Sequence, residues 1–442
     1  MVGELAKKLF PDGIEVPFDD FAESIKQTGK LLQNRRPLFE ASITAGGIYS
    51  RVDILNPVDE DDWDIVEVKS STSVKKVHIE DVCFQKHCCN RRGMKIRNCY
   101  LLHINSECIK DGEIDPMQFF TIEDISEEVE KATIGIEGRI EQIIEAISAT
   151  ECPEVGIGKH CTDPYGCPLT ECWDFLPEGH IFDLYRGGAR SFELFEEGIL
   201  AISEIPDDCT LSGAQQIQKG CAITGQPYVN REGITDFLIN LQYPLHYLDF
   251  ETFGPGIPIF DGTRPYQSIP FQFSLHIVKD EESTSEHFSF LAEGIDDPRP
   301  GLLGELKKVL GNSGSIIVYN QRFEEGILRD LGRTFPEYDG WVSQVCDRLV
   351  DLLKPFSSFD YYHPLQRGSA SLKNVLPALT GRGYEDMDIA NGQEASITFQ
   401  AVTYGEAPEE ARLKVRADLE KYCAVDTEGM IWIVDRLRDI IK

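Results

Sequence analysis

The chain has 442 residues, a length that favours two domains over one. Its formal net charge is −32, which excludes a protein that coats nucleic acid non-specifically. An enzyme that grips nucleic acid in a local basic groove and holds metal ions with its acids stays compatible with this charge. We see no signal peptide and no apolar run of about twenty residues, so we expect no membrane span. The 13 cysteines, an odd number, favour a cytoplasmic protein.

The first half of the chain predicts a small α/β domain. Turn-forming residues separate short runs of β-branched and aromatic residues, and helical periodicity flanks them. The order is helix, three strands, helix, strand. Helices are predicted over 18–35 and 75–92, and strands over 38–44, 48–55, 63–70 and 96–104. The pattern of residues 116–150 predicts acidic helical structure, and a stretch rich in Cys and Pro follows at 152–177.

The second half predicts a connector and then a mixed α/β domain. Residues 178–240 predict helices and loops. Strands are then predicted over 245–250, 270–278, 286–291 and 315–319, and helices over 301–310, 323–332, 341–353, 371–379 and 410–440. We therefore expect three parts: a domain over 1–150, a Cys-rich segment and helical connector over 151–242, and a domain over 243–442.

Four carboxylates and a tyrosine stand out in the second half. In the stretch "LDFETF", Asp249 and Glu251 are two residues apart on a strand and point to the same face. Glu324 lies in the first turn of a helix that follows a buried strand. Tyr422 and Asp426 are four residues apart on the last helix and share one face. Neighbouring carboxylates repel each other unless a cation lies between them.

This set of motifs resembles the DEDD superfamily of 3′–5′ exonucleases, and its DEDDy branch in particular, over residues 245–440. The resemblance implies an RNase H-like fold and two Mg²⁺ or Mn²⁺ ions, held by Asp249, Glu251, Glu324 and Asp426. It also implies that Tyr422 positions or helps deprotonate the attacking water. The family usually has Asp where this chain has Glu324, and the additional methylene can shift a metal ion.

A second acidic pattern lies in the first half. Asp53 falls late in one predicted strand, and Glu67 and Lys69 share a face of the next. The spacing D-(x)13-E-V-K resembles the PD-(D/E)XK nuclease core, especially its RecB-like branch. The resemblance implies one or two metal ions at Asp53 and Glu67, a catalytic Lys69, a motif glutamine at Gln85 and an accessory ligand at Glu40. The alternative is an ordinary pair of surface charges.

Three cysteines follow this region as Cys161-x5-Cys167-x4-Cys172. Several RecB-like nucleases hold a 4Fe-4S cluster with three cysteines at this place and one upstream. The upstream cysteine is absent here, so the fourth ligand stays open, with Cys152 and His160 as substitutes. A structural zinc ion or reduced thiols are the alternatives.

These resemblances imply a DNA nuclease with two sites, of an uncharacterised, mainly prokaryotic family. The expected substrate is single-stranded DNA ends, shortened from the 3′ end by the C-terminal site. An RNA-trimming exonuclease is the first alternative, and a catalytically impaired module that binds nucleic acid ends is the second. A scaffold with no nucleic acid function is the third. The sequence indicates no protein partner.

Overall fold

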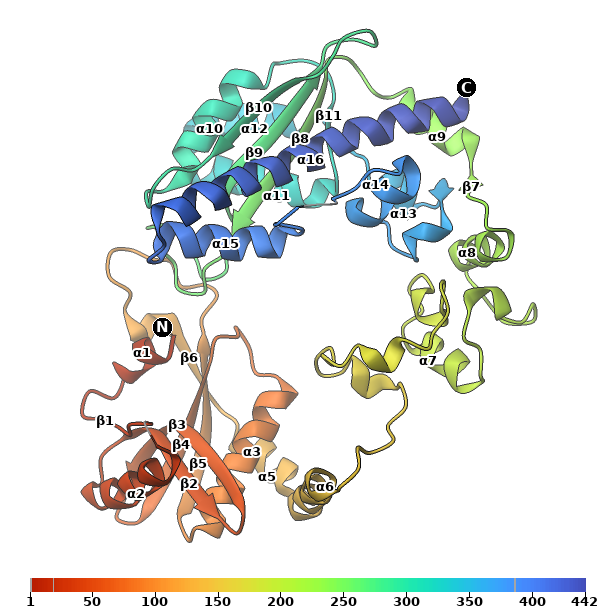
Figure 1. Cartoon of the computed structure of the whole chain (residues 1–442). Coiled ribbons are helices and arrows are strands. Elements are labelled where there is room, and N and C mark those ends of the chain that lie inside the picture. The colour runs from red at the N-terminus through yellow and green to blue at the C-terminus, as the bar shows by residue number, and fades with distance from the viewer. Residues whose placement is uncertain (1, 19, 385–386) are drawn as a thin grey trace. The chain divides into compact units, whose positions relative to one another are not determined.

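A computed structural model of the chain describes residues 2–18, 20–384 and 387–442. The chain forms two compact units, each with a sheet of its own (Figure 1). The first unit contains Met1–Val155 together with Pro255–Gln267, and the second contains Gly156–Gly254 together with Ser268–Lys442. Both units are mixed α/β structures, as the sequence predicts.

The first unit is built on a six-stranded sheet with the order β1-β2-β3-β4-β5-β6. The β2–β3, β3–β4 and β5–β6 pairs are antiparallel. The β1–β2 and β4–β5 pairs are parallel, and α3 joins β4 to β5. The strands are β1 (Ile14–Glu15), β2 (Leu38–Ala45), β3 (Ile48–Val58), β4 (Asp62–Lys69), β5 (Lys95–Ile104) and β6 (Phe120–Asp124). The helices are α1 (Val2–Lys7), α2 (Phe21–Leu31), α3 (Lys76–Arg91), α4 (Pro116–Phe119), α5 (Ser126–Thr133) and α6 (Ile136–Ser148).

Both faces of this sheet are buried. Leu55 and Ile65 contribute to one core, together with Val82 of α3, and α2, α5 and α6 add apolar residues to it. Ile54 and Val66 contribute to a second core, which α1 and α4 cover. Adjacent residues of a strand point to opposite faces, so one pair of strands supplies both cores.

The segment Pro255–Gln267 belongs by its contacts to the first unit, although it lies in the predicted C-terminal part, 243–442. It pairs with the chain at Lys110 through two backbone hydrogen bonds. The Lys110 N–H donates to the Thr263 carbonyl at 3.0 Å, and the Gly262 N–H donates to the Lys110 carbonyl at 2.8 Å. The long connection after β8 is therefore ordered by the first unit's own surface.

The second unit is built on a five-stranded sheet with the order β10-β9-β8-β11-β12. Its strands are β8 (Leu245–Phe253), β9 (Ile269–Val278), β10 (Glu286–Leu291), β11 (Ile316–Val318) and β12 (Leu349–Asp351), and a separate pair is formed by β7 (Tyr228–Val229) and β13 (Tyr361–Tyr362). Its helices are α7 (Ala189–Glu196), α8 (Gly213–Thr224), α9 (Arg231–Leu238), α10 (Pro298–Val309), α11 (Gln321–Thr334), α12 (Asp339–Cys346), α13 (Lys354–Ser357), α14 (Leu372–Thr380), α15 (Gly392–Tyr404) and α16 (Glu409–Ile441).

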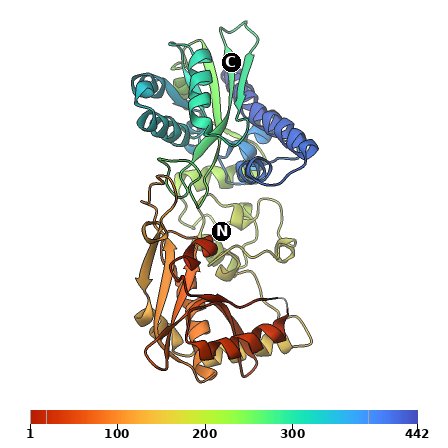
Figure 2. The same ribbon diagram turned by 90° about the vertical axis from the view of Figure 1, so that its left-hand side faces the viewer.

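Helices cover both faces of this second sheet. Helices α10, α11 and α12 pack on one face, and α9, α14 and α16 pack on the other. Figure 2 shows α10 and α16 on opposite sides of the strands. Helix α16 also packs closely on α14 at Gly429, where a Cβ atom would lie 2.8 Å from a Leu376 methyl carbon. Because Gly429 has no side chain, helix α16, which carries Asp426, can lie close to α14.

Most predicted strands and helices are confirmed, two predictions are wrong, and one long helix was missed. Residues 116–150 contain strand β6 as well as helices, because an exposed edge strand lacks an alternating apolar pattern. The helix predicted over 341–353 ends at Cys346, and the short strand β12 follows. Helix α15 was not predicted, since its glycine, threonine and valine residues have low helix propensity. No helix in the described ranges is long and apolar enough to cross a membrane.

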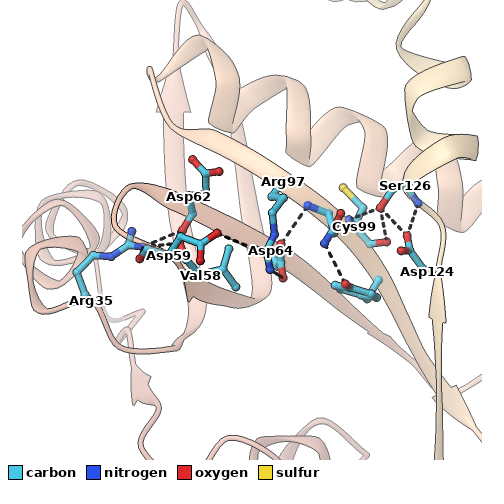
Figure 3. Close-up of polar contacts among 11 residues, drawn as sticks. Arg35, Val58, Asp59, Asp62, Asp64, Arg97, Cys99, Asp124 and Ser126 are labelled. Carbon is cyan, nitrogen blue, oxygen red and sulfur yellow. Dashed lines mark hydrogen bonds and ion pairs between the residues drawn. The ribbon is translucent and has the colours of Figure 1, made fainter.

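Arg35 holds the backbone of the turn between β3 and β4, and Arg97 pairs with the side chain of Asp59 in the same turn at 2.8 Å (Figure 3). The Arg35 guanidinium donates from Nη2 to the carbonyls of Val58, Asp59 and Asp62, at 3.0, 2.9 and 2.9 Å. Its Cζ atom also lies 4.5 Å from the centroid of the Trp63 ring. Charged hydrogen bonds and a cation–π contact therefore hold this hairpin, and the hairpin sets the register that places Asp53 beside Glu67.

We expect Arg35→Ala to lower the free energy of unfolding of the first unit by about 2 kcal/mol, since three carbonyls lose a charged donor. Arg36→Ala is the matched control, because Arg36 is exposed and its Nε atom donates to one carbonyl, that of Asp12. The control should change stability by at most about 0.5 kcal/mol. Urea unfolding measures both values, and equal losses in the two variants would contradict this role of Arg35.

Candidate active sites

The central strand β8 brings two acids of the second unit to one face of the sheet. Asp249 and Glu251 share this face with Tyr247, which packs beneath α9, α14 and α16. Asp426 of α16 faces them, and one carboxylate oxygen from each of the three residues lies within 4.8 Å of the others. In the described part of the chain, this is the only group of three or more acidic, histidine or cysteine side chains with metal-binding spacing.

Buried polar contacts from strand β9 hold α16 in this position. The Gln272 amide donates from Nε2 to the Leu419 carbonyl at 3.0 Å. The Thr427 hydroxyl lies 2.7 Å from the Ser274 hydroxyl and 2.8 Å from Nδ1 of His276. Because Thr427 is the neighbour of Asp426, these contacts determine where the Asp426 carboxylate lies relative to β8.

The three carboxylates carry a large electrostatic penalty when they are ionised. Burial raises the pKa of Asp249 well above its ordinary value, and Asp426 and Glu251 raise it further. Burial and Asp426 raise the pKa of Glu251 to about 8, and burial raises that of Asp426 to about 6. Two unit charges about 5 Å apart repel each other by about 3 kcal/mol at an effective dielectric constant near 20. Bound protons or a bound cation must therefore reduce the repulsion among these three carboxylates.

Glu324 approaches the same group from α11. This helix begins after Asn320, which has a left-handed backbone conformation with φ of 76°, and its first turn carries Glu324. The side chain is buried, and its Oε2 atom has no hydrogen-bond partner among the described residues. Burial and the charge of Asp249 raise the pKa of Glu324 to about 9. A buried carboxylate oxygen without a donor is a free ligand position.

Two tyrosines and a lysine complete the surroundings of Asp426. The Tyr384 hydroxyl donates to Oδ1 of Asp426, and Tyr422 hydrogen-bonds to the same carboxylate. The ammonium of Lys373 lies 5.6 Å from the Tyr384 ring centroid and 5.3 Å from that of Tyr422. Its charge lowers the pKa values of Glu251 and Asp426. The sequence prediction included Tyr422 but not Tyr384 or Lys373, because no spacing pattern links these two to the acids.

The first unit brings its predicted residues together by strand register. The antiparallel β3–β4 register ends at Ile54 and Val66, so the next residues of the two strands, Asp53 and Glu67, lie beside each other. The Asp53 carboxylate accepts the Val68 N–H at 2.8 Å. Further along β4, the Lys69 ammonium donates to Oε1 of Glu67 at 2.6 Å.

Helix α3 adds two residues to this cluster. Gln85 donates from Nε2 to Oε2 of Glu67 at 2.8 Å and to Oδ1 of Asp81 at 3.3 Å. The Lys69 ammonium also donates to Oδ2 of Asp81 at 2.7 Å. Asp81 was not among the predicted site residues, although its spacing of four from Gln85 places both on one face of the helix and could have indicated it.

The pKa values of the acids in the first unit are also raised, but the positive charge of the Lys69 side chain partly offsets their negative charge. Burial raises the pKa of Asp53 to about 6, and Glu40 adds to the shift. Burial and Asp53 raise the pKa of Glu67 to about 7. Burial lowers the pKa of Lys69, yet the charges of Glu67 and Asp81 outweigh this and raise it, so Lys69 stays protonated at neutral pH.

Glu40, the predicted accessory ligand, lies beside Asp53. Its φ of 57° is uncommon for a residue other than glycine, and it pairs with Arg51 through an Nε to Oε2 distance of 3.0 Å. Glu40 and Asp53 line a cavity of about 260 Å³, together with Lys7 of α1 and Ser70. Backbone strain at a cavity that contains acids is consistent with a ligand site.

The structure does not gather the three cysteines of the Cys-rich segment. Cys161 is half-buried, and Cys167 and Cys172 are exposed, all with free thiols. Within the described ranges, their sulfur atoms do not form a group with metal-binding spacing. The iron–sulfur or zinc site therefore stays a prediction from the sequence.

Comparisons with known proteins find one family model and one relative for part of the chain. A family model described as a domain of unknown function, DUF2779, matches residues 246–371. This segment contains Asp249, Glu251 and Glu324 but ends before Asp426. The chain is 27% identical over 215 residues to the uncharacterized protein MG366 of Mycoplasma genitalium. That match covers 44% of this chain and 32% of the relative, so this chain spans about a third of the relative's length. No solved structure matches the chain.

We expect the metal-free protein to lose stability as the pH rises from about 5 to about 8. Unfolded carboxyls titrate near pH 4, whereas the folded pKa of Asp426 is about 6 and that of Glu251 about 8. The folded state therefore binds more protons in this window, and the free energy of unfolding falls as they leave. Thermal unfolding in the presence of a chelator measures this slope.

Asp249→Asn should make the slope shallower, because it removes a carboxyl group that keeps its proton in the folded state and loses it near pH 4 in the unfolded state. Mn²⁺ should raise the melting temperature of the parent protein more than that of Asp249→Asn, since binding to the folded state is lost at this site. Glu420→Gln removes an exposed acid of the same helix α16 and should behave like the parent. An unchanged slope in Asp249→Asn would show that burial and the neighbouring acids do not raise the pKa of Asp249.

Proposed function

We propose that the chain is a metal-dependent nuclease with a 3′–5′ exonuclease site in the second unit. The observation that carries this proposal is the cluster of Asp249, Glu251 and Asp426, whose ligand oxygens lie within 4.8 Å of one another. Glu324 supplies a further buried oxygen without a donor. All these donors are carboxylates, which suit hard ions such as Mg²⁺ and Mn²⁺. A mixed sheet with acids on its central strand and last helix supports the RNase H-like fold.

The chain's own residues have distinct tasks in this proposal. Asp249, Glu251, Glu324 and Asp426 would hold the ions, and bound ions would supply charge stabilisation and an acidified water for phosphodiester hydrolysis. Tyr384 and Tyr422 keep Asp426 in place through their hydrogen bonds. Burial and the neighbouring acids raise the pKa of Tyr422. Its hydroxyl therefore stays protonated at neutral pH and orients a water molecule rather than removing a proton from it.

We propose a second nuclease site, of the PD-(D/E)XK type, in the first unit. The order α2-β2-β3-β4-α3-β5 supports this type, and so does the position of Asp53 beside Glu67 across β3 and β4. Because Lys69 stays protonated, it would act as a cation that neutralises charge on a phosphate group. A metal ion at this site would be held by Asp53 and Glu67, with Glu40 as an accessory ligand.

The first test uses a 5′-labelled single-stranded DNA with Mg²⁺ or Mn²⁺. We expect the parent to produce a ladder that shortens from the 3′ end. Asp249→Asn and Asp426→Asn should each reduce this shortening by about 100-fold or more, since the site loses several kcal/mol of charge stabilisation. Glu420→Gln, on α16 but outside the cluster, should digest like the parent. Equal digestion by all four proteins would contradict the assignment of this site.

The second test addresses the first unit in the Asp249→Asn background, where its activity is visible alone. Adding Lys69→Ala should reduce the remaining cleavage by about 100-fold, because the phosphate loses its cationic partner. Lys76→Ala is the control, since Lys76 is exposed on the adjacent helix α3. If cleavage persists in the chain with Lys69→Ala, the site in the first unit is wrongly assigned.

The same assays separate the alternative functions. An RNA oligomer of the same sequence, degraded while the DNA persists, would indicate an RNA-trimming exonuclease. Binding of 3′ ends without hydrolysis in either metal would indicate a module that binds nucleic acid ends.

A further inference from the structure

Both carboxylate oxygens of Glu67 are already occupied by neighbouring side chains. Oε1 accepts the Lys69 ammonium at 2.6 Å, and Oε2 accepts the Gln85 amide at 2.8 Å. Glu67 is buried, so water does not compete freely for these positions. Each oxygen keeps a second lone pair, so the obstacle to a cation is electrostatic: a cation at Oε1 would lie beside the Lys69 ammonium, which it repels, whereas it does not repel the neutral amide of Gln85.

Asp81 provides Lys69 with a second acceptor on the other side. Its Oδ2 atom lies 2.7 Å from the Lys69 ammonium, almost the same distance as Oε1 of Glu67. The Gln85 amide at 3.3 Å from Oδ1 holds the Asp81 carboxylate in this orientation. Lys69 is thus shared between one buried acid on β4 and one half-exposed acid on α3.

We propose that Asp81 is a positioning residue that draws Lys69 away from Glu67 when a divalent cation binds there. The exchange leaves Oε1 of Glu67 free as a ligand and keeps the ammonium beside the site, where a phosphate group can use it. Without Asp81, Glu67 is the one acid among the described residues that still forms an ion pair with Lys69, so Lys69 competes with the cation for Oε1. This inference rests on the nuclease site proposed for the first unit.

A through-space effect is the main competing explanation. Any acid near a cation site increases affinity by simple attraction, whether or not Lys69 is present. The proposed role differs because it acts through Lys69, so the effects of Asp81 and Lys69 must be coupled. A double-mutant cycle measures this coupling.

The experiment measures Mn²⁺ binding by titration calorimetry in the full chain with Asp249→Asn, which disables the second unit's cluster. We expect Asp81→Asn to weaken Mn²⁺ binding to the first unit by about tenfold, a change of about 1.4 kcal/mol in binding free energy. In a chain that also carries Lys69→Met, the same substitution should change the affinity by less than about twofold. Asp81→Glu should keep the parent affinity within about threefold, since the acceptor is retained.

Glu80→Gln is the matched control, because Glu80 is the adjacent acid and pairs with exposed Lys76 at 3.5 Å. It makes the same change of charge on α3 and should leave the affinity unchanged. Equal weakening by Asp81→Asn with and without Lys69 would overturn the inference and leave the metal site intact. A different result would contradict the proposed metal site itself. If the Asp249→Asn chain binds no Mn²⁺, or if adding Asp53→Asn leaves its Mn²⁺ binding unchanged, the first unit has no such site and this inference is wrong as well.

Discussion

The contact between α16 and the β8–β9 strands is the constraint on which the second unit depends. Helix α16 carries Asp426, and hydrogen bonds from Gln272, Ser274 and His276 on β9 hold the helix across the sheet. Three carboxylates are thereby kept within 4.8 Å of one another in a buried place. Repulsion of this kind would separate mobile side chains. Here the packing of a 33-residue helix resists it, and the site retains an electrostatic demand for a cation or for protons.

Both candidate sites contain buried carboxylates that repel one another, but the two sites differ in how a lysine acts on these charges. In the first unit, Lys69 and Gln85 already occupy the oxygens of Glu67, so the resting cluster carries its own cation. In the second unit, Lys373 lies over the rings of Tyr384 and Tyr422 and acts on the acids only through space. If metal ions bind as proposed, Lys69 must shift at the first site, whereas no cation forms an ion pair with the three grouped carboxylates of the second among the described residues.

Part of each site could be predicted from the spacing of residues along a single strand or helix. Asp249 and Glu251 lie two residues apart on a strand, and Tyr422 and Asp426 lie four apart on a helix, so each pair shares a face whatever the fold. Asp81 and Gln85 carry the same signal on α3, but the glutamine alone was assigned. Residues such as Tyr384 and Lys373 could not be assigned, because they reach Asp426 from separate elements with no common period. The short strand β12 and the edge strand β6 were missed for a related reason, since few of their residues face a core.

The sequence by itself determined the mixed α/β class, most elements and the acids that share a face, because these follow from periods of 2.0 and 3.6 residues. Only the tertiary structure decided which faces meet. It set Asp53 beside Glu67 through the register of one hairpin, and it placed Asp426 against β8 through the packing of α16. It also left the sulfur atoms of Cys161, Cys167 and Cys172 ungrouped, although they are close in sequence. Proximity between elements depends on long-range packing, which local spacing does not encode.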